Sequence, residues 1–196
     1  MPAALRQKQH LRRRARASRR SISNSRQALA AASLKQHLLR RALLHKSKTI
    51  AFYMARDGEL SLTPLLSQCA RIGKRCYLPV VDGPHLYFVR YRIHDATQMS
   101  DMQITEPTDT RERISATDLD LVFVPLVAFD CRGHRLGMGG GYYDRSFASV
   151  NKTRRQGRKP VLCGIAHTKQ RRRSLPRDHW DVRMQCLATE RSLISF

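Results

Sequence analysis

Residues 119–129 read LDLVFVPLVAF, and residues 137–145 read GMGGGYYDR. The first stretch is nearly all apolar up to Val127, which is typical of a central strand that is covered on both faces. The second stretch begins with a glycine-rich run and leads into a helix that we expect from about Tyr142. A central strand followed by a glycine-rich loop and a helix indicates an α/β protein.

The flanking sequence alternates between strand-like and helix-like segments. Three β-prone segments precede the apolar stretch, at 49–54, 75–81 and 86–89, and three follow it, at 161–165, 186–189 and 192–196. A helix opens near Thr63-Pro64 and stops at Gly73, so we expect a parallel β-α-β unit followed by a hairpin. Residues 94–117 are polar, contain Pro107 and lack periodicity, which predicts a long loop.

The amino-terminal region predicts helix and is strongly basic. Leu, Ala and Arg dominate residues 3–20 and 26–44. The second segment carries an apolar stripe near helical spacing, whereas the first has little such stripe; the stripe consists of Leu29, Ala32, Leu34, Leu38, Ala42 and Leu43. We expect one domain, in which the basic helical region 1–46 packs on an α/β core of residues 47–196. Acidic residues are absent before Asp57, so an organelle transit peptide is the alternative interpretation.

The bulk composition limits the partners and the location. The net charge of +22 attracts anionic ligands, and nucleotides, folates and RNA all qualify. The apolar stretch at 119–129 is far shorter than the roughly 20 residues that cross a bilayer, and the amino terminus lacks a secretory apolar core. Five cysteines without a C-x-x-C pair indicate free thiols in a reducing compartment. We therefore expect a cytoplasmic protein without a membrane span.

The glycine run indicates a phosphate site. Small residues let backbone N–H groups approach phosphate oxygens, but Gly137–Gly141 lacks the Gly-Lys-Ser/Thr of a Walker loop and the spacing of a dinucleotide fingerprint. Glycines alone are equally consistent with a flexible turn. The residues that follow favour the phosphate site, because Asp144 offers a carboxylate for magnesium and Arg145 a cation for phosphate.

The run from Arg135 to Arg145 resembles the hallmark of the 5-formyltetrahydrofolate cyclo-ligases, also called methenyltetrahydrofolate synthetases. The preceding residues 120–130 are similar to that family's hydrophobic strand and Phe-Asp turn. The segments Lys8–Arg12, Met54–Glu59 and Trp180–Val182 agree with the family in order and approximate spacing, so the resemblance spans about 8–190. The match at Lys8–Arg12 argues against the transit peptide.

The resemblance implies a fold and a set of site residues. The fold would be three-layer α/β, with a mostly parallel central sheet flanked by helices, Rossmann-like (NagB/RpiA/CoA-transferase-like), with a helical amino-terminal arm. The implied ATP-binding residues are Lys8, Arg12, Arg135, Gly137, Met138, Gly139, Gly140, Gly141, Tyr142, Tyr143, Asp144 and Arg145, of which Tyr142, Tyr143 and Arg145 are also catalytic candidates. The implied folate-binding residues are Met54, Glu59, Glu106 and Tyr143, and the implied magnesium ligands are Asp144 and Asp181.

The residues themselves leave other interpretations of these assignments open. Asp57-Gly58-Glu59 also reads as a plain turn, Glu106 as a surface acid, and the arginines after Arg12 as an RNA-binding arm. Lys169, Arg171, Arg172, Arg173 and Arg177 fill a stretch that is often acidic in the family, which leaves the alignment of Asp181 open.

The implied reaction is the ATP- and magnesium-dependent closure of 5-formyltetrahydrofolate to 5,10-methenyltetrahydrofolate. Transfer of a phosphoryl group to the formyl oxygen turns a poor leaving group into phosphate, and a second folate nitrogen then closes the ring. We expect a monomer with a folate substrate. Two alternatives are a basic RNA-binding or ribosome-associated protein, and an enzyme of the same fold that acts on another anionic metabolite.

Overall fold

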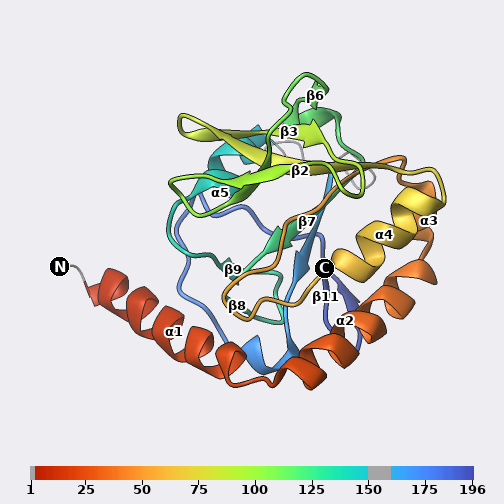
Figure 1. Ribbon diagram of the computed structural model, residues 1–196. Coiled ribbons are helices and arrows are strands. Elements are labelled where there is room, and N and C mark those ends of the chain that lie inside the picture. Colours follow the sequence, from red (N-terminus) through yellow and green to blue (C-terminus); the bar gives the residue numbers. More distant parts are fainter. Residues whose placement is uncertain (1–2, 150–159) are drawn as a thin grey trace.

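The apolar stretch forms the middle of the sheet. The computed structural model describes residues 3–149 and 160–196 (Figure 1). Within those residues, eight strands form one sheet in the order β12-β11-β10-β7-β1-β2-β3-β6. Their bounds are β1 Thr49–Ala51, β2 Arg75–Asp82, β3 His85–Arg90, β6 Arg113–Ile114, β7 Leu121–Pro125, β10 Val161–Ile165, β11 Cys186–Ala188 and β12 Leu193–Ser195. As its apolar sequence predicts, β7 has a parallel neighbour on each side.

The sheet is mostly parallel, which confirms the predicted class. The ladders β1–β2, β1–β7, β7–β10 and β10–β11 are parallel, whereas the outer ladders β2–β3, β3–β6 and β11–β12 are antiparallel. Helix α4 (Thr63–Arg71) joins β1 to β2 and has Pro64 in its first turn, where proline's missing N–H costs nothing. The predicted β-α-β unit and the β2–β3 hairpin are therefore both present.

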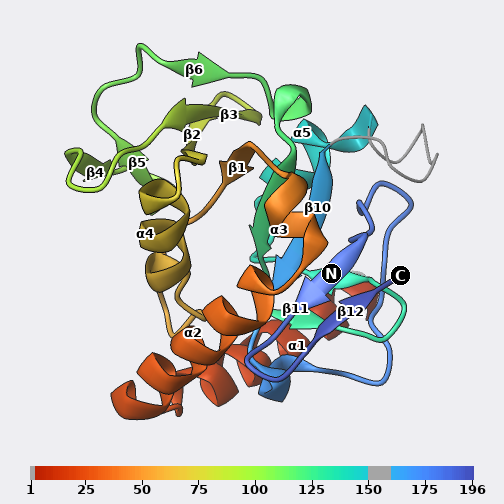
Figure 2. The ribbon, with the colours of Figure 1, turned by 90° about the vertical axis from the view of Figure 1, so that its right-hand side faces the viewer.

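Helices lie on both faces of this sheet, as predicted for three layers (Figure 2). On one face, α2 (Asn24–Leu39), α3 (Ala42–Lys46) and α4 pack on the central strands through buried residues such as Leu34, Leu65 and Phe123. On the other face, α5 (Tyr142–Ser146) and the 3-10 turn η1 (Ala116–Asp118) pack around Phe88 and Phe147. The glycine loop thus begins a helix that is anchored on the sheet.

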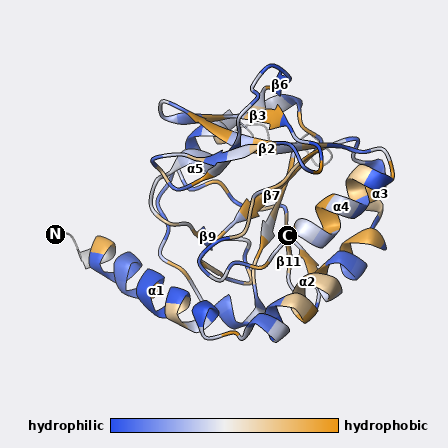
Figure 3. Ribbon diagram, viewed as in Figure 1, coloured by the Kyte–Doolittle hydropathy of each residue, from blue (hydrophilic) through white to orange (hydrophobic). Residues whose placement is uncertain are grey.

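Helix α1 (Ala3–Arg20) crosses the edge of the sheet instead of covering a face (Figure 1). Its Ala15 packs with Val127, Leu136 and Leu175, which belong to the segments that follow β7 and β10. The rest of α1 is mostly hydrophilic (Figure 3). The helix therefore lies over loops at the carboxyl ends of the strands, where α/β sheets hold their ligands.

Two predicted elements differ from the structure. Residues 94–117 contain a hairpin of β4 (Thr97–Met99) and β5 (Thr105–Pro107), followed by β6 and η1, so the prediction of a long loop was wrong. All three residues of β4 are exposed, so the strand is held by backbone hydrogen bonds and leaves no apolar signal in the sequence. Likewise, the strand predicted at 49–54 ends at Ala51.

The second predicted helix is broken into α2 and α3. Leu38 and Leu44 are both buried, yet six residues of helix separate two side chains by about 240°, so a continuous helix could not bury both on one face. Within the predicted stripe, Leu34 and Leu38 are buried as expected, but Leu29 is 70% exposed and Ala32 and Ala42 face solvent. Ala30 and Ala31 take their place in the core.

The five cysteines are free thiols, as the sequence predicts. Cys69, Cys76, Cys163 and Cys186 are free and buried, and Cys131 is free and exposed.

A short connection of β8 (Ala128–Phe129) and β9 (Arg135–Leu136) forms a separate two-stranded sheet that carries the chain to the glycine loop. Over the described ranges 3–149 and 160–196, we find no helix with the length and apolar character to span a bilayer.

Candidate nucleotide and folate site

The glycine-rich loop runs from β9 to α5 with an open backbone. Met138, Gly139 and Gly140 are exposed, so their main chain is accessible to a ligand. Gly141 caps α5 with a φ of 68°, and a Cβ atom there would lie 2.6 Å from the Arg145 guanidinium. Both the left-handed backbone and the close approach of Arg145 therefore require glycine at this position.

Two guanidinium groups, one from α1 and one from α5, donate hydrogen bonds to carbonyl groups of the loop. Arg12 on α1 donates from Nε to the Gly137 carbonyl at 2.9 Å, and Arg145 on α5 donates from Nη2 to the Gly140 carbonyl at 2.8 Å. Arg145 also donates to Pro84 O at 2.6 Å and lies over the Tyr142 ring at 5.1 Å. Burial lowers the pKa of Arg12, although two nearby aspartates oppose the change. Cationic side chains thus flank an exposed glycine backbone, as phosphate binding requires.

The predicted magnesium ligand Asp144 lies between the loop and the carboxyl-terminal segment. Its Oδ1 accepts hydrogen bonds from Arg135 Nη2 at 2.7 Å and from Val182 N at 3.0 Å. Arg135 is buried and also donates to Val182 O at 2.6 Å, so its guanidinium positions Asp144 through direct contact. These two hydrogen bonds fall on one oxygen, so Oδ2 can act as a ligand without breaking either.

The second predicted ligand, Asp181, precedes Val182 and belongs to a small charged cluster. The Lys8 ammonium lies 3.3 Å from Asp181 Oδ2 and 2.7 Å from Asp178 Oδ2, and Asp181 Oδ2 also accepts the Asp178 N–H at 2.8 Å. Burial would lower the pKa of Lys8, but the two carboxylates raise it. The structure therefore brings Lys8, Arg12, Asp144 and Asp181 to one region, while their roles stay predictions.

Within the residues that the structure describes, no group of three or more His, Cys, Asp or Glu side chains is arranged to hold a metal ion. A cation at Asp144 and Asp181 would need further oxygens from elsewhere. Phosphate oxygens of a nucleotide are the usual complement for magnesium, which keeps few protein ligands. The donor set therefore fits a cation that arrives together with phosphate better than one held by the protein alone.

The folate candidates Glu59 and Tyr143 lie close enough together for their charges to interact. Burial raises the pKa of Glu59, while Arg19 opposes this change across 3.5 Å. Burial also raises the pKa of the Tyr143 phenol, and the charge of Glu59 adds to the effect. Tyr143 stacks on Phe147, with ring centroids 6.2 Å apart, which fixes the direction of its hydroxyl. A largely buried carboxylate and an oriented phenol thus lie in one region of the protein.

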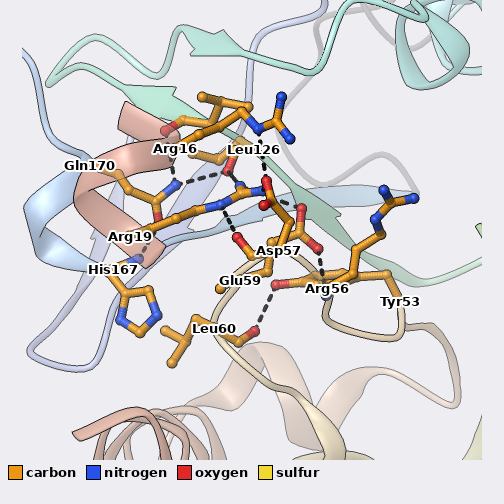
Figure 4. Close-up of polar contacts among 12 residues, drawn as sticks. Arg16, Arg19, Tyr53, Arg56, Asp57, Glu59, Leu60, Leu126, His167 and Gln170 are labelled. Carbon is orange, nitrogen blue, oxygen red and sulfur yellow. Dashed lines mark hydrogen bonds and ion pairs between the residues drawn. The ribbon is translucent and has the colours of Figure 1, made fainter. Parts of the chain in front are cut away.

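A network of arginines holds the Glu59 loop against α1 (Figure 4). Arg19 is fully buried and donates to Asp57 O and Asp57 Oδ2, both at 2.7 Å, while Arg16 donates to Asp57 Oδ2 at 2.8 Å. Arg20 also contacts Asp57. Gly58 follows with a φ of 75°, and a Cβ there would lie 3.1 Å from the Arg19 carbonyl, so glycine permits the close contact with α1.

The two remaining folate candidates have structural neighbours of their own. Met54 is half-buried and packs against the main core cluster. Glu106 is buried on β5 and accepts the Val81 N–H of β2 at 3.0 Å, so it anchors the β4–β5 hairpin to the sheet. The reading of Glu106 as a surface acid was therefore wrong, and its contact with folate stays a prediction.

Sequence reasoning missed Asp57, Asp178 and Arg19 as members of the site. Asp178 stands three residues before Asp181, a spacing that brings two carboxylates onto one turn. Arg19 was hidden among exposed arginines, yet Lys8, Leu11, Arg12, Ala15 and Arg19 recur at the three- and four-residue spacing of one helix face. The first helix does have a stripe, but cations make up most of it.

The fold and the site define a three-layer α/β protein with a phosphate-type glycine loop at the carboxyl edge of a mostly parallel sheet. Residues 4–190 match the model of the 5-formyltetrahydrofolate cyclo-ligase family. The chain belongs to this family.

Individual relatives agree with this assignment. The 5-formyltetrahydrofolate cyclo-ligase of Escherichia coli (strain K12) is 39% identical over 145 residues, which cover 72% of this chain and 77% of the relative. That of Haemophilus influenzae is 34% identical over 179 residues, covering 89% and 93%. The NMR structure of Aquifex aeolicus 5,10-methenyltetrahydrofolate synthetase superposes with a TM-score of 0.80 at 32% identity, covering 96% of this chain and 92% of the other. A synthetase from Mycoplasma pneumoniae, at 23% identity and a TM-score of 0.71, shares the fold.

Proposed function

We propose that the protein converts 5-formyltetrahydrofolate to 5,10-methenyltetrahydrofolate in a reaction that consumes ATP and requires magnesium. Membership of the cyclo-ligase family makes it a ligase of folate one-carbon metabolism. The observation that carries the ATP dependence is the exposed glycine loop held between Arg12 and Arg145, with Asp144 beside it. These groups are the ones that phosphoryl transfer needs for positioning and for charge compensation.

The proposed chemistry activates the formyl oxygen. The amide oxygen of the N5-formyl group attacks the terminal phosphorus of ATP, ADP departs, and the oxygen becomes part of a phosphate ester. N10 then attacks the formyl carbon, the carbon–oxygen bond breaks, and phosphate leaves with that oxygen. The N10 proton is lost to the phosphate or to solvent as the five-membered ring closes. ATP thus supplies the leaving group and appears as ADP and phosphate.

The chain's own cations would balance the charge of the nucleotide. Arg12 and Arg145 contact the loop, Lys8 lies one helical turn before Arg12, and all three would bind phosphate oxygens, while Gly137–Gly141 offers backbone N–H groups. Arg135 acts one step away, because both of its terminal nitrogens already bind Asp144 and the Val182 carbonyl. The Tyr142 ring makes a cation–π contact with the Arg145 guanidinium and helps to hold it in place.

Asp144 and Asp181 would hold magnesium. Both offer carboxylate oxygens, the hard ligands that this ion prefers, and Val182 N ties Asp144 to the residue next to Asp181. When bound, the ion would neutralise the phosphate charge that develops during transfer.

Glu59 and Tyr143 would orient the pterin ring. An amino-pyrimidinone edge donates two parallel hydrogen bonds, and a carboxylate accepts both in a forked geometry. Arg19 and the Arg56 N–H, which donates to Glu59 Oε2 at 3.2 Å, favour the ionised form against the effect of burial. Met54 would supply apolar contact next to the ring, and Glu106 stays a predicted further contact.

One absorbance measurement tests the proposal. Methenyltetrahydrofolate has its own near-ultraviolet band, so purified protein should produce this band only when 5-formyltetrahydrofolate, ATP and magnesium are all present. Omission of each component in turn is the control. A band that forms without ATP, or no band with the full mixture, would refute the proposal.

The basic surface leaves a secondary partner open. Arg6, Arg13 and Arg14 on the outer side of α1 are exposed, and the positive field around them can attract RNA. The folate is the proposed main partner. Affinity for nucleic acid, a monomeric state and a cytoplasmic location stay predictions.

A further inference from the structure

The ammonium group of Lys8 forms an ion pair with Asp181, the carboxylate that we propose as a magnesium ligand. Lys8 Nζ lies 3.3 Å from Asp181 Oδ2 and 2.7 Å from Asp178 Oδ2. The lysine is only 8% exposed, whereas the two aspartate side chains are 37% and 23% exposed, so water screens these contacts only in part. One positive charge is thus shared between two carboxylates, one of which is a proposed metal ligand.

A divalent cation at Asp181 and the Lys8 ammonium would compete for the same carboxylate group. Both are positive, so at a separation of a few ångströms they repel each other strongly in a partly buried site. Asp181 Oδ2 also accepts the Asp178 N–H, which restricts how far this carboxylate can turn to serve both. The repulsion therefore favours a cation at Asp181 most when Lys8 has left this carboxylate.

Phosphate bound at the glycine loop would offer Lys8 a second partner. Lys8 lies four residues before Arg12 on the same face of α1, and Arg12 contacts Gly137 of the glycine loop at 2.9 Å. A lysine side chain is a compact charge on a flexible four-carbon stem, so its ammonium can change partners while the helix stays in place. Phosphate oxygens at the loop would offer it a partner as anionic as the one it leaves.

We propose that Lys8 is an exchangeable counterion: it neutralises Asp181 until a nucleotide arrives, then moves to the phosphates and leaves Asp181 to the divalent cation. The cation consequently binds together with the nucleotide and only weakly by itself. This inference rests on the proposed function, because it takes Asp181 as a metal ligand and Lys8 as a phosphate contact.

The proposal predicts effects of opposite sign from a single substitution. In Lys8→Met, Asp181 loses its competitor, so Mn²⁺ used as a magnesium probe should bind the protein without nucleotide about tenfold more tightly, a change of about 1.4 kcal/mol. The same variant loses a phosphate contact, so a non-hydrolysable ATP analogue in the presence of EDTA should bind about tenfold more weakly. Electron paramagnetic resonance of free Mn²⁺ and calorimetry of the analogue measure the two affinities.

Two further variants sharpen the test. Lys46→Met makes the same substitution and the same change of net charge at an exposed position in the last turn of α3, and should alter neither affinity. Asp178→Asn removes the nearer partner of Lys8 and makes the ammonium easier to release, so metal-free binding of the analogue should become about threefold tighter. A general loss of structure cannot produce this gain.

The outcomes separate this inference from the proposed function. Tighter Mn²⁺ binding with weaker analogue binding in Lys8→Met supports the exchange. Unchanged or weaker Mn²⁺ binding in Lys8→Met, in a wild-type background that closes the folate ring, overturns the exchange alone. Wild-type protein that binds neither the analogue nor Mn²⁺ with the analogue overturns the proposed function, and the exchange with it.

Discussion

At the amino-terminal end of α1, Lys8 contacts two carboxylates whose side chains are 37% and 23% exposed, whereas at the carboxyl-terminal end Arg19 contacts two that are only 8% and 10% exposed. Lys8 has few fixed geometric requirements, but the guanidinium of Arg19 also donates to the carbonyls of Asp57 and Leu126. The same helix therefore carries a charge that can change partners and a charge that cannot. Exposure and the number of fixed hydrogen bonds decide which is which.

We expect the largest effect from Asp144→Asn, which changes a proposed magnesium ligand in the same region as the exchangeable charge of Lys8. We expect turnover to fall on the order of 10³-fold, because a metal ion contributes several kcal/mol to the stabilisation of transition-state charge. The amide keeps the shape of the side chain and can still accept from Arg135, so the free energy of unfolding should change far less. Steady-state kinetics with the absorbance band measure the loss. Asp118→Asn, an exposed acid on η1, is the matched control, and near-normal turnover in Asp144→Asn would refute the assignment.

Arg19→Met tests the fixed end. It leaves Asp57 and Glu59 without their buried partner, and loss of one member of a buried ion pair costs about 3–5 kcal/mol. Lys8→Met, whose partners remain open to water, should cost about 1 kcal/mol or less. Urea unfolding at neutral pH measures both.

Arg14→Met is the control for this pair, since Arg14 is exposed on the same helix. Equal losses of stability in Arg19→Met and Lys8→Met would contradict the distinction between the two ends.

Glu59→Gln links the fixed end to folate recognition. We expect the folate KM to rise about 10- to 100-fold at neutral pH, because a hydrogen bond to a charged group contributes about 1.5–3 kcal/mol. Burial raises the pKa of Glu59, so this carboxyl gains its proton at a higher pH than usual. The wild-type KM should therefore rise as the pH falls through that raised pKa, while the variant loses this dependence.

Initial rates at several folate concentrations and pH values measure the effect, with exposed Glu112→Gln as the control. A variant that retains the wild-type pH dependence of KM would show that another group carries it.

Much of this comparison could be predicted from the sequence, but not all of it. The apolar run before Pro125 and the glycines after Leu136 predict a central strand and the loop that follows it, because each depends on local chemistry. The family motif places Lys8, Arg12 and Asp144 at one site, and the structure brings them together. These residues share a site because α1 packs over the loops at the carboxyl edge of the sheet, where the glycine loop also lies.

The unpredicted parts depend on contacts between distant segments. Arg19 and Asp57 are 38 residues apart, and the arginine looks like its exposed neighbours until α1 is placed over the loop after β1. The β4–β5 hairpin is held by backbone pairing and by Glu106, so its sequence carries no periodic pattern. Local patterns predict elements, whereas burial of a charge depends on what packs over it.

Arg16→Ala should produce the smallest effect at the fixed end. Arg16 is 34% exposed and is one of three arginines on Asp57, so its loss should lower the free energy of unfolding at neutral pH by about 0.5–1 kcal/mol. Burial would raise the pKa of Asp57, but the hydrogen bonds from Arg16, Arg19 and Arg20 outweigh it and lower this pKa to about 2. Stability from a lowered pKa is fully present above the unfolded value of about 3.9 and is lost as the pH falls towards 2. With Arg16 removed, the folded pKa moves up, so the difference between variant and wild type should shrink between pH 4 and pH 2. Urea unfolding across that range measures this convergence, and a difference that stays constant down to pH 2 would show that Arg16 stabilises the protein through packing alone.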